Sequence, residues 1–130
     1  YNENSTSKLM ILGKALNNLN VLKEYKTTYM YLKRDELKEH NYEKGDTEGV
    51  VNYGLSLKNI EFTAMFIEDL EDENLIKISF RSKNNFPCNK FAKDNFYGGG
   101  HINAAGGKFE GKIDNAIALF IKKIKEFKFH

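Results

Sequence analysis

Apolar residues recur at helical spacing near both ends of the chain, whereas apolar and polar residues alternate in its middle. Ser5 or Ser7 can cap a first helix. The apolar positions of this helix lie mostly on one face, at Leu9, Met10, Leu16 and Leu19. A last helix is predicted from about residue 114 to 127, with its apolar positions at Ile117, Phe120, Ile121, Ile124 and Phe127.

The segments that follow the first helix predict a strand and two short helical stretches. β-branched and aromatic residues favour a strand within residues 21–32, and a short polar helix follows at 34–40. Gly45-Asp46 then breaks the chain. Asp46 or Thr47 caps a helical stretch through Val50, Val51 and Leu55, with Glu48 in its first turn, where the helix dipole favours a negative charge.

The clearest alternation lies in residues 75–80, which pair as a hairpin with residues 60–67 across an acidic turn. Ile76, Ile78 and Phe80 share one face, so that Arg81 ends the strand on the opposite, polar face. Residues 89–95 then predict a short helix with Phe91 and Ala92 inward, and residues 108–112 predict an edge strand. Together the elements predict an α/β fold, a single compact domain with a mixed β-sheet flanked by helices.

Length and composition fit one domain. The 130 residues are 41% hydrophobic and 29% charged, which is enough for one core and too little for two ordinary domains. The longest apolar stretches, such as Ala116 to Ile121, fall far below the roughly 18 residues of a membrane span, and no charged-then-apolar leader opens the chain. We therefore expect a cytoplasmic protein that makes no membrane contact.

Cysteine and charge exclude several classes of site. Cys88 stands alone, so no intrachain disulfide can form and no Cys/His cluster is available for zinc; a packed thiol is expected. A formal charge of +2 is too small to indicate nucleic-acid binding by itself, so that any anion site must be local. Arg34 and Arg81 are the two arginines of this lysine-rich chain, and a guanidinium can bind phosphate bidentately.

Residues 98–107, Gly-Gly-Gly-His-Ile-Asn-Ala-Ala-Gly-Gly, form the most informative segment. A tight turn between two helices is one interpretation. The favoured one is an anion cradle, in which glycines let the backbone of a turn that leads into a helix approach a ligand. No Gly-Lys-Ser/Thr follows, and no long apolar strand precedes, so neither a nucleotide-triphosphatase loop nor a dinucleotide fingerprint is present.

His101 is a structural histidine, a general acid or base, a metal ligand or a hydrogen-bond donor to phosphate. Metal ligation is the least favoured, because His40 and His130 stand in a polar helix and at the terminus, without suitably spaced carboxylates. We favour ligand binding, since an imidazole beside a phosphate prefers its protonated, doubly donating form. Arg81-Ser82-Lys83 adds a guanidinium, a hydroxyl and an ammonium after a strand, and is interpreted as functional rather than as plain surface.

These segments resemble a known family. Residues 78–82, Ile-Ser-Phe-Arg-Ser, followed by Gly98-Gly99-Gly100-His101 to Gly107, resemble the C-terminal, DHH-associated domain of the DHH phosphoesterases over about residues 19–127. Residues 46–53, Asp-Thr-Glu-Gly-Val-Val-Asn-Tyr, look like the nanoRNase branch, which comprises oligoribonucleases and phosphoadenosine-phosphate phosphatases.

The resemblance implies a two-domain enzyme. In the family, an N-terminal domain holds two divalent metals, usually manganese, on Asp and His clusters, and the C-terminal domain grips the substrate across a cleft. The chain has no Asp-His-His cluster, so it is expected to bind no metal, to carry no catalytic residue and to be inactive alone. Residues 1–18 are then expected to form a linker helix from a missing DHH domain, and residues 19–130 the substrate-binding domain.

The resemblance also assigns the binding residues. Arg81 and Ser82 match the family's Arg-Ser pair, and the substrate-binding loop comprises Gly98, Gly99, Gly100 and His101. Asn103 and Ala104 lie in the same motif, and Thr47 and Glu48 are weaker candidates.

The implied function is binding of nucleotide phosphate for hydrolysis of short oligoribonucleotides, with 3′-phosphoadenosine 5′-phosphate as a second substrate. The expected partners are short RNA or a nucleotide phosphate and the DHH domain of the same chain; a homodimer is also compatible. The alternatives are a RecJ-like exonuclease, a cyclic-dinucleotide phosphodiesterase and an exopolyphosphatase. Outside the enzyme class stand a non-catalytic nucleic-acid-binding module, as in alanyl-tRNA synthetases, and a purely structural or oligomerising domain.

Overall fold

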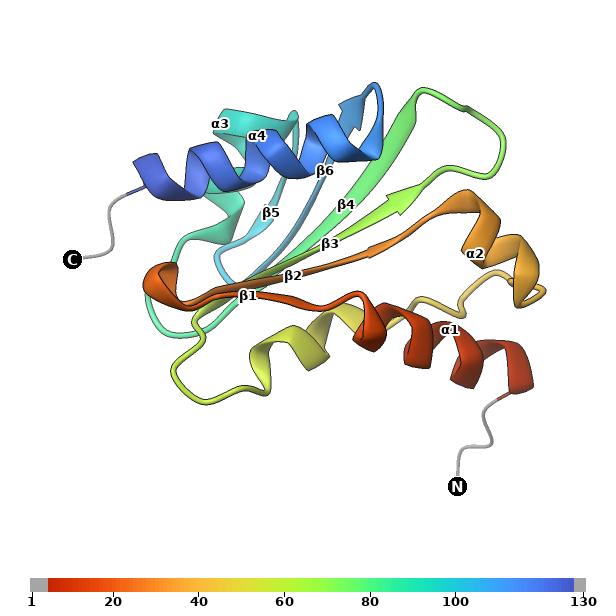
Figure 1. Ribbon diagram of the computed structural model, residues 1–130. Coiled ribbons are helices and arrows are strands. Elements are labelled where there is room, and N and C mark those ends of the chain that lie inside the picture. The colour runs from red at the N-terminus through yellow and green to blue at the C-terminus, as the bar shows by residue number, and fades with distance from the viewer. Residues whose placement is uncertain (1–4, 128–130) are drawn as a thin grey trace.

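A six-stranded sheet with helices on both faces organises the computed structural model, which describes residues 5–127 (Figure 1). In chain order the strands are β1 Asn20–Leu22, β2 Thr27–Leu32, β3 Phe62–Glu68, β4 Leu75–Ser82, β5 Gly99–His101 and β6 Ala104–Glu110. They lie side by side in the order β1-β2-β3-β4-β6-β5. Only β2 and β3 pair in parallel among these strands, so the sheet is mixed, and the predicted α/β class is confirmed.

Four α-helices and two short 3-10 helices complete the described chain. The α-helices are α1 Thr6–Asn17, α2 Arg34–Glu39, α3 Cys88–Phe96 and α4 Ile113–Glu126. The 3-10 helices are η1 Lys23–Tyr25 and η2 Val50–Leu55. Helices α3 and α4 lie on one side of the sheet, and α1 and η2 lie on the other (Figure 1).

The larger core lies between the sheet and the helices α3 and α4. It is rich in phenylalanine, and rings from the sheet, such as Phe62 and Phe80, contact Phe91 of α3 and Phe120 of α4. Each of these four rings is fully buried. The alternation predicted for β4 and the inward residues predicted for the two helices are therefore confirmed, with Cys88 packed in the same core.

The smaller core lies on the opposite face, where Met30, Leu32 and Met65 of the sheet contact Ile11 and Ala15 of α1. The predicted cap of α1 is confirmed, because the Ser5 hydroxyl accepts from the backbone N–H of Lys8 at 3.1 Å.

The predicted apolar face of α1 is wrong for three of its four residues, whereas Leu19, just after the helix, packs against the smaller core. Leu9, Met10 and Leu16 are exposed, whereas the helix is buried through Ile11 and Ala15.

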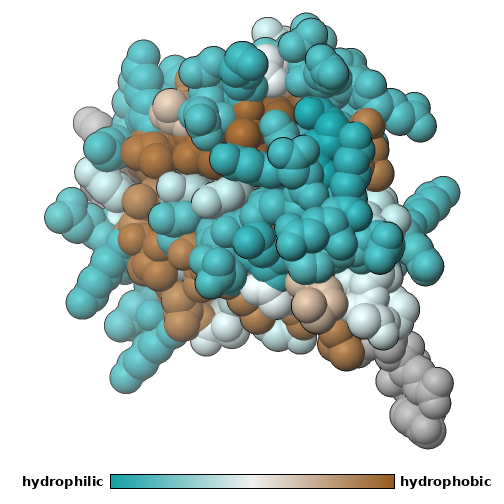
Figure 2. Space-filling view, turned by 45° about the vertical axis from the view of Figure 1, so that its right-hand side comes forward, coloured by the Kyte–Doolittle hydropathy of each residue, from teal (hydrophilic) through white to brown (hydrophobic). Residues whose placement is uncertain are grey.

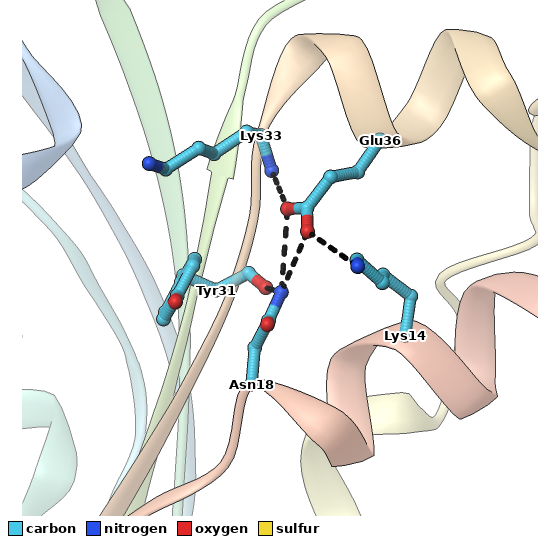
Figure 3. A network of polar contacts seen from close by, with 5 residues as sticks. All are labelled: Lys14, Asn18, Tyr31, Lys33 and Glu36. Carbon is cyan, nitrogen blue, oxygen red and sulfur yellow. Dashed lines mark hydrogen bonds and ion pairs between the residues drawn. The ribbon is translucent and has the colours of Figure 1, made fainter.

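A polar network joins α1, β2 and α2 at the edge of this core (Figure 3). The buried Asn18 amide donates to the Tyr31 carbonyl at 2.9 Å and to the Glu36 carboxylate at 3.1 and 3.2 Å. The Lys33 N–H and the Lys14 ammonium also contact that carboxylate, at 2.8 and 3.4 Å. Burial works against ionisation, but these donors outweigh it and hold the pKa of Glu36 below its ordinary value.

Two sequence predictions about strands are wrong in detail. Residues 21–32 form two antiparallel strands rather than one, because η1 and Lys26, with φ of +51°, turn the chain between them. The strand predicted at 108–112 begins at Ala104 instead. Its first half lies between β4 and β5, whereas Lys108–Glu110 pairs with β4 alone among the described strands and is an edge, as predicted. The first half of this strand contains Gly106 and Gly107 and has no apolar alternation, so its sequence does not predict a strand.

The helical stretch after Gly45-Asp46 also differs from its prediction. It is a 3-10 helix that begins at Val50, and Gly49, with φ of +79°, stands at its cap. Neither Asp46 nor Thr47 caps it; the Asp46 carboxylate instead accepts from the Glu43 N–H at 2.8 Å within the preceding turn. Glu48 therefore lies before the helix rather than in its first turn.

One side of the described surface is largely polar. Figure 2 shows one side of the molecule, covered mainly by hydrophilic side chains with hydrophobic ones in smaller groups. None of the helices within residues 5–127 is long and apolar enough to cross a membrane.

Candidate functional site

The glycine-rich segment forms a hairpin at the edge of the sheet. Strands β5 and β6 pair from His101↔Ala104 to Gly99↔Gly106, and Ile102-Asn103 make the loop between them. The segment is therefore neither a turn between two helices nor a turn that leads into a helix, and both sequence interpretations of its geometry are wrong. Its backbone is presented as a flat strand pair instead.

Three of its glycines are required by the fold itself. A Cβ on Gly98 would lie within 2.8 Å of Gly107 Cα and closer still to the Gly106 carbonyl. Gly100 has φ of +144° and lies against Ala104, and Gly107 lies against Phe96 of α3. At these positions a side chain would displace backbone.

The other two glycines of the hairpin have free space beside them. A Cβ on Gly99 would meet nothing within 4 Å, and one on Gly106 would meet only the Ile78 carbonyl at 3.6 Å. Both residues are exposed. Because the fold does not require glycine here, the missing side chains point to the approach of another molecule.

Strand register brings the predicted residues together on one face of β4, β6 and β5. Arg81 pairs with Ala104, and Ala104 pairs with His101. Since neighbouring strands lie about 4.8 Å apart, the Arg81 and His101 backbones stand about 10 Å apart with Ala104 between them. The next row of the same face holds only small residues, namely Ser79, Gly106 and Gly99. We call these six residues the open face.

The helices that share this side of the sheet leave the open face accessible. Helix α1 packs over β2, and η2 packs over β2 and β3 and reaches β4. Thr28 marks this boundary, because its hydroxyl donates to the Gly54 carbonyl of η2 and lies 2.8 Å from the Thr63 hydroxyl, beside Arg81 in the register. Beyond that boundary Gly99, His101 and Gly106 are exposed, so a ligand can lie flat on the sheet.

The charge on the open face comes from Arg81. Its guanidinium is half-buried and donates once, from Nη1 to the Phe80 carbonyl at 2.8 Å. No ion pair among residues 5–127 involves it. A guanidinium has five N–H donors, so most remain for an anion placed between Arg81 and the exposed His101 imidazole.

Ser82 and Asn103 connect the hairpin to the loop after β4. The buried Ser82 hydroxyl lies 2.8 Å from the Phe86 carbonyl and 3.1 Å from the Ile102 carbonyl, and it accepts from the Asn103 amide at 2.9 Å. The Ser82 N–H donates to the Asn103 carbonyl at 3.1 Å. These contacts hold His101 in register with Arg81, and they use the Ser82 hydroxyl within the fold.

Cys88 lies beneath the same hairpin. Its N–H donates to the Ile102 carbonyl at 2.8 Å, and its sulfur lies 3.8 Å from the His101 carbonyl. Burial raises the pKa of the Cys88 thiol and outweighs the opposing effects of the Ser82 hydroxyl and the Arg81 charge. The thiol therefore stays neutral and packs, as predicted.

Thr47 and Glu48 lie in the turn before η2, and the structure does not bring them together with the open face. Thr47 lines a hollow with Lys77 near the β3–β4 turn. Glu48 lines a different hollow with Lys8 beside α1. Neither hollow includes Arg81 or His101.

Ser79, Gly106 and Tyr97 were not predicted as individual site residues. The alternation of β4 puts Ser79 on the same face as Arg81, and Gly106 belongs to the glycine-rich motif. Knowledge that β4 pairs with β6 would have identified both as neighbours in the site. Tyr97 precedes the three glycines and lines a hollow of 780 Å³ between the end of α3, β6 and α4. Within the described residues no group of three or more His, Cys, Asp or Glu side chains could hold a metal ion.

Comparisons with known proteins place these features in a family. A family model described as the DHHA1 domain matches residues 24–127. An exopolyphosphatase-related protein from Bacteroides fragilis has a solved structure that superposes with a TM-score of 0.92 at 42% identity, covering 98% of this chain and 36% of that one. A search of curated proteins finds no match.

A second solved structure shares the fold. The pGpG-specific phosphodiesterase PggH from Vibrio cholerae superposes with a TM-score of 0.63 at 12% identity, covering 92% of this chain and 38% of that one. At this identity the likeness concerns the fold alone. The chain thus spans little more than a third of either solved protein.

Proposed function

The chain belongs to the DHHA1 domain family, and from this premise we propose that it is the phosphate-binding domain of a DHH-family phosphoesterase. Its ligand is a short oligoribonucleotide, with 3′-phosphoadenosine 5′-phosphate as a second substrate, as in the nanoRNase branch. The observation that carries the proposal is the juxtaposition of Arg81 and His101 across a floor of small residues, on an accessible part of the sheet.

In this proposal, some residues of the open face bind the phosphate and others let it approach the sheet. Arg81 donates a bidentate pair of hydrogen bonds to a phosphate, and the His101 imidazole donates another from the opposite side. Each charge-assisted bond contributes about 1.5–3 kcal/mol. Gly99, Ala104 and Gly106 let the phosphate lie close to the sheet, while Ser82 and Asn103 hold the hairpin in position.

Hydrolysis belongs to a longer protein that contains this domain. The two divalent metals that the family resemblance implies have no fitting ligand set among residues 5–127, so the chain's own residues bind and orient only. In such a protein a DHH domain faces the open face, residues 1–18 link it to this domain and residues 19–130 bind substrate. Assembly as a homodimer and a cytoplasmic location complete the proposal.

An exopolyphosphatase is the second candidate, because the B. fragilis protein at 42% identity is described as exopolyphosphatase-related. Its substrate carries phosphates without bases, and Arg81 and His101 would hold one of them in the same way. The two candidates differ in whether any residue of the domain recognises a base.

Calorimetric titration of the chain with a 5′-phosphorylated diribonucleotide tests the proposal. Arg81→Ala and His101→Ala are expected to weaken binding at least about tenfold each, equivalent to about 1.4 kcal/mol. Lys122→Ala, which removes an exposed charge from α4, is the matched control and should change nothing. Unaltered affinity in both site variants would contradict the proposal. In a longer protein with its DHH domain, the same variants should lower turnover at least about tenfold.

A further inference from the structure

Tyr97 is exposed in an unusual way. Its side chain is 88% exposed, although it directly precedes the glycine-rich hairpin. It ends α3 in the left-handed conformation, with φ of +51°, at a position where glycine or asparagine is preferred. Among the described residues five non-glycine residues have positive φ, and three of them are asparagines, whereas Tyr97 is the aromatic one. The end of a helix does not need an exposed aromatic ring, so its side chain calls for another explanation.

A hollow of 780 Å³ lies beside this ring. It is lined by Lys93, Asp94, Asn95, Tyr97, Lys108, Phe109, Glu110 and Leu119. Strand β5 pairs with β6 only as far as Gly106, so the outer edge of Lys108–Glu110 has no strand partner in residues 5–127. Backbone donors and acceptors of this edge, the Lys93 and Lys108 ammoniums and the Glu110 carboxylate therefore surround one exposed ring. The other two polar side chains have partners within the protein, because the Asp94 carboxylate pairs with Lys90 and the Asn95 amide donates to the Phe91 carbonyl.

The hollow lies at the outer edge of the sheet on the side of α3 and α4, and Tyr97 and Lys108 connect it to the open face on the other side. Tyr97 stands two residues before Gly99, so their Cα atoms are at most about 7 Å apart. Lys108 extends the β6 row of Ala104 and Gly106 on the same face of the sheet. A ligand with its phosphate over Gly99 and Gly106 can therefore extend around this edge and bring its neighbouring group to the ring of Tyr97.

We propose that Tyr97 stacks on a nucleobase of the ligand, and that the hollow between the end of α3 and the edge of β6 receives this base. The inference rests on the proposed phosphate site and adds to it a residue that contacts the base, which would distinguish a nucleotide from a chain of bare phosphates. A tyrosine face stacks on any base, so the site selects for the presence of a base rather than for its identity.

Two ligands, one with bases and one without, distinguish base binding from phosphate binding. Dissociation constants of a 5′-phosphorylated diadenylate and of tripolyphosphate are measured for the wild-type chain, Tyr97→Asn, Tyr97→Phe and Tyr53→Asn. Tyr53 is a matched control, since it is 48% exposed and lines the hollow beside α1. Tyr97→Asn should weaken the diadenylate at least about fivefold and leave tripolyphosphate within about twofold. Tyr97→Phe and Tyr53→Asn should bind both ligands as the wild type does.

The unfolding midpoint distinguishes binding from structure. Asparagine suits the left-handed position better than tyrosine, so Tyr97→Asn should unfold at the same temperature as the wild type or higher. A lower midpoint, unchanged diadenylate binding, or equal weakening of both ligands would overturn the inference. Arg81→Ala tests the phosphate site separately: if it weakens both ligands while Tyr97→Asn weakens neither, only the stacking role fails. If Arg81→Ala weakens neither ligand, the proposed function fails as well.

Discussion

Gly106→Ala is expected to change ligand affinity without lowering the stability of the fold. The new Cβ would meet only the Ile78 carbonyl, at an ordinary contact distance of 3.6 Å. Alanine also loses less conformational entropy than glycine on folding, which favours the folded state by about 0.5–1 kcal/mol. The free energy of unfolding should therefore stay constant or rise. The same methyl group would project from the open face into the space assigned to the phosphate, and we expect binding of a 5′-phosphorylated diribonucleotide to weaken at least about tenfold.

Gly98→Ala is the matched comparison eight positions earlier in the same motif. Its Cβ would lie within 2.8 Å of Gly107 Cα, so backbone must move and the thermal midpoint should fall by several degrees. Thermal unfolding followed by circular dichroism and calorimetric titration measure the two effects in both variants. Wild-type affinity in Gly106→Ala would refute the reasoning, because the open face would then not be in contact with the ligand. A marked loss of stability in Gly106→Ala would refute it as well.

Three further substitutions test the supporting structure. Glu36→Gln should cost about 1–2 kcal/mol of stability at neutral pH, measured by urea unfolding. Because the folded pKa of Glu36 is held below its ordinary value of 4.5, the wild type's advantage is complete above that value and is lost as the pH falls through the lowered pKa; a constant difference down to low pH would contradict the network. Asn103→Ala should cost about 1–2 kcal/mol and weaken phosphate binding, since it releases the hairpin from Ser82; stability loss with intact affinity would argue against a positioning role. Phe120→Ala should cost about 3–5 kcal/mol, and a loss below about 1 kcal/mol in chemical denaturation would show that the aromatic core is not packed as described.

Strong periodicity allowed much of the fold to be predicted. The alternation of Ile76, Ile78 and Phe80 placed Arg81 on the polar face, and the spacing of Phe120 and Ile124 placed α4 on the core. Both patterns reflect burial of one face, which local sequence records directly. The helix face of α1 was not predictable in this way, because which of its apolar residues packs depends on a sheet that is distant in sequence.

The candidate site could be predicted as a set of residues but not as a shape. The motif identified Arg81 and His101, yet their juxtaposition depends on β6 lying between β4 and β5, and glycine-rich strands carry no apolar alternation. The same lack of pattern led to the prediction of an anion-binding turn where the chain forms a hairpin. Tyr97 could not be predicted as a site residue, because its exposure and its left-handed backbone conformation are known only from the folded structure.

The central claim, that the open face binds a phosphate, is tested most directly by amide nuclear magnetic resonance during titration with a 5′-phosphorylated diribonucleotide. The account predicts saturable shifts of the Gly99, His101, Ala104 and Gly106 amides, with the amide of the buried Ile11 in α1 unmoved, and loss of these shifts in Arg81→Ala. Shifts confined to other surfaces, or shifts on the open face that persist in Arg81→Ala, would contradict it.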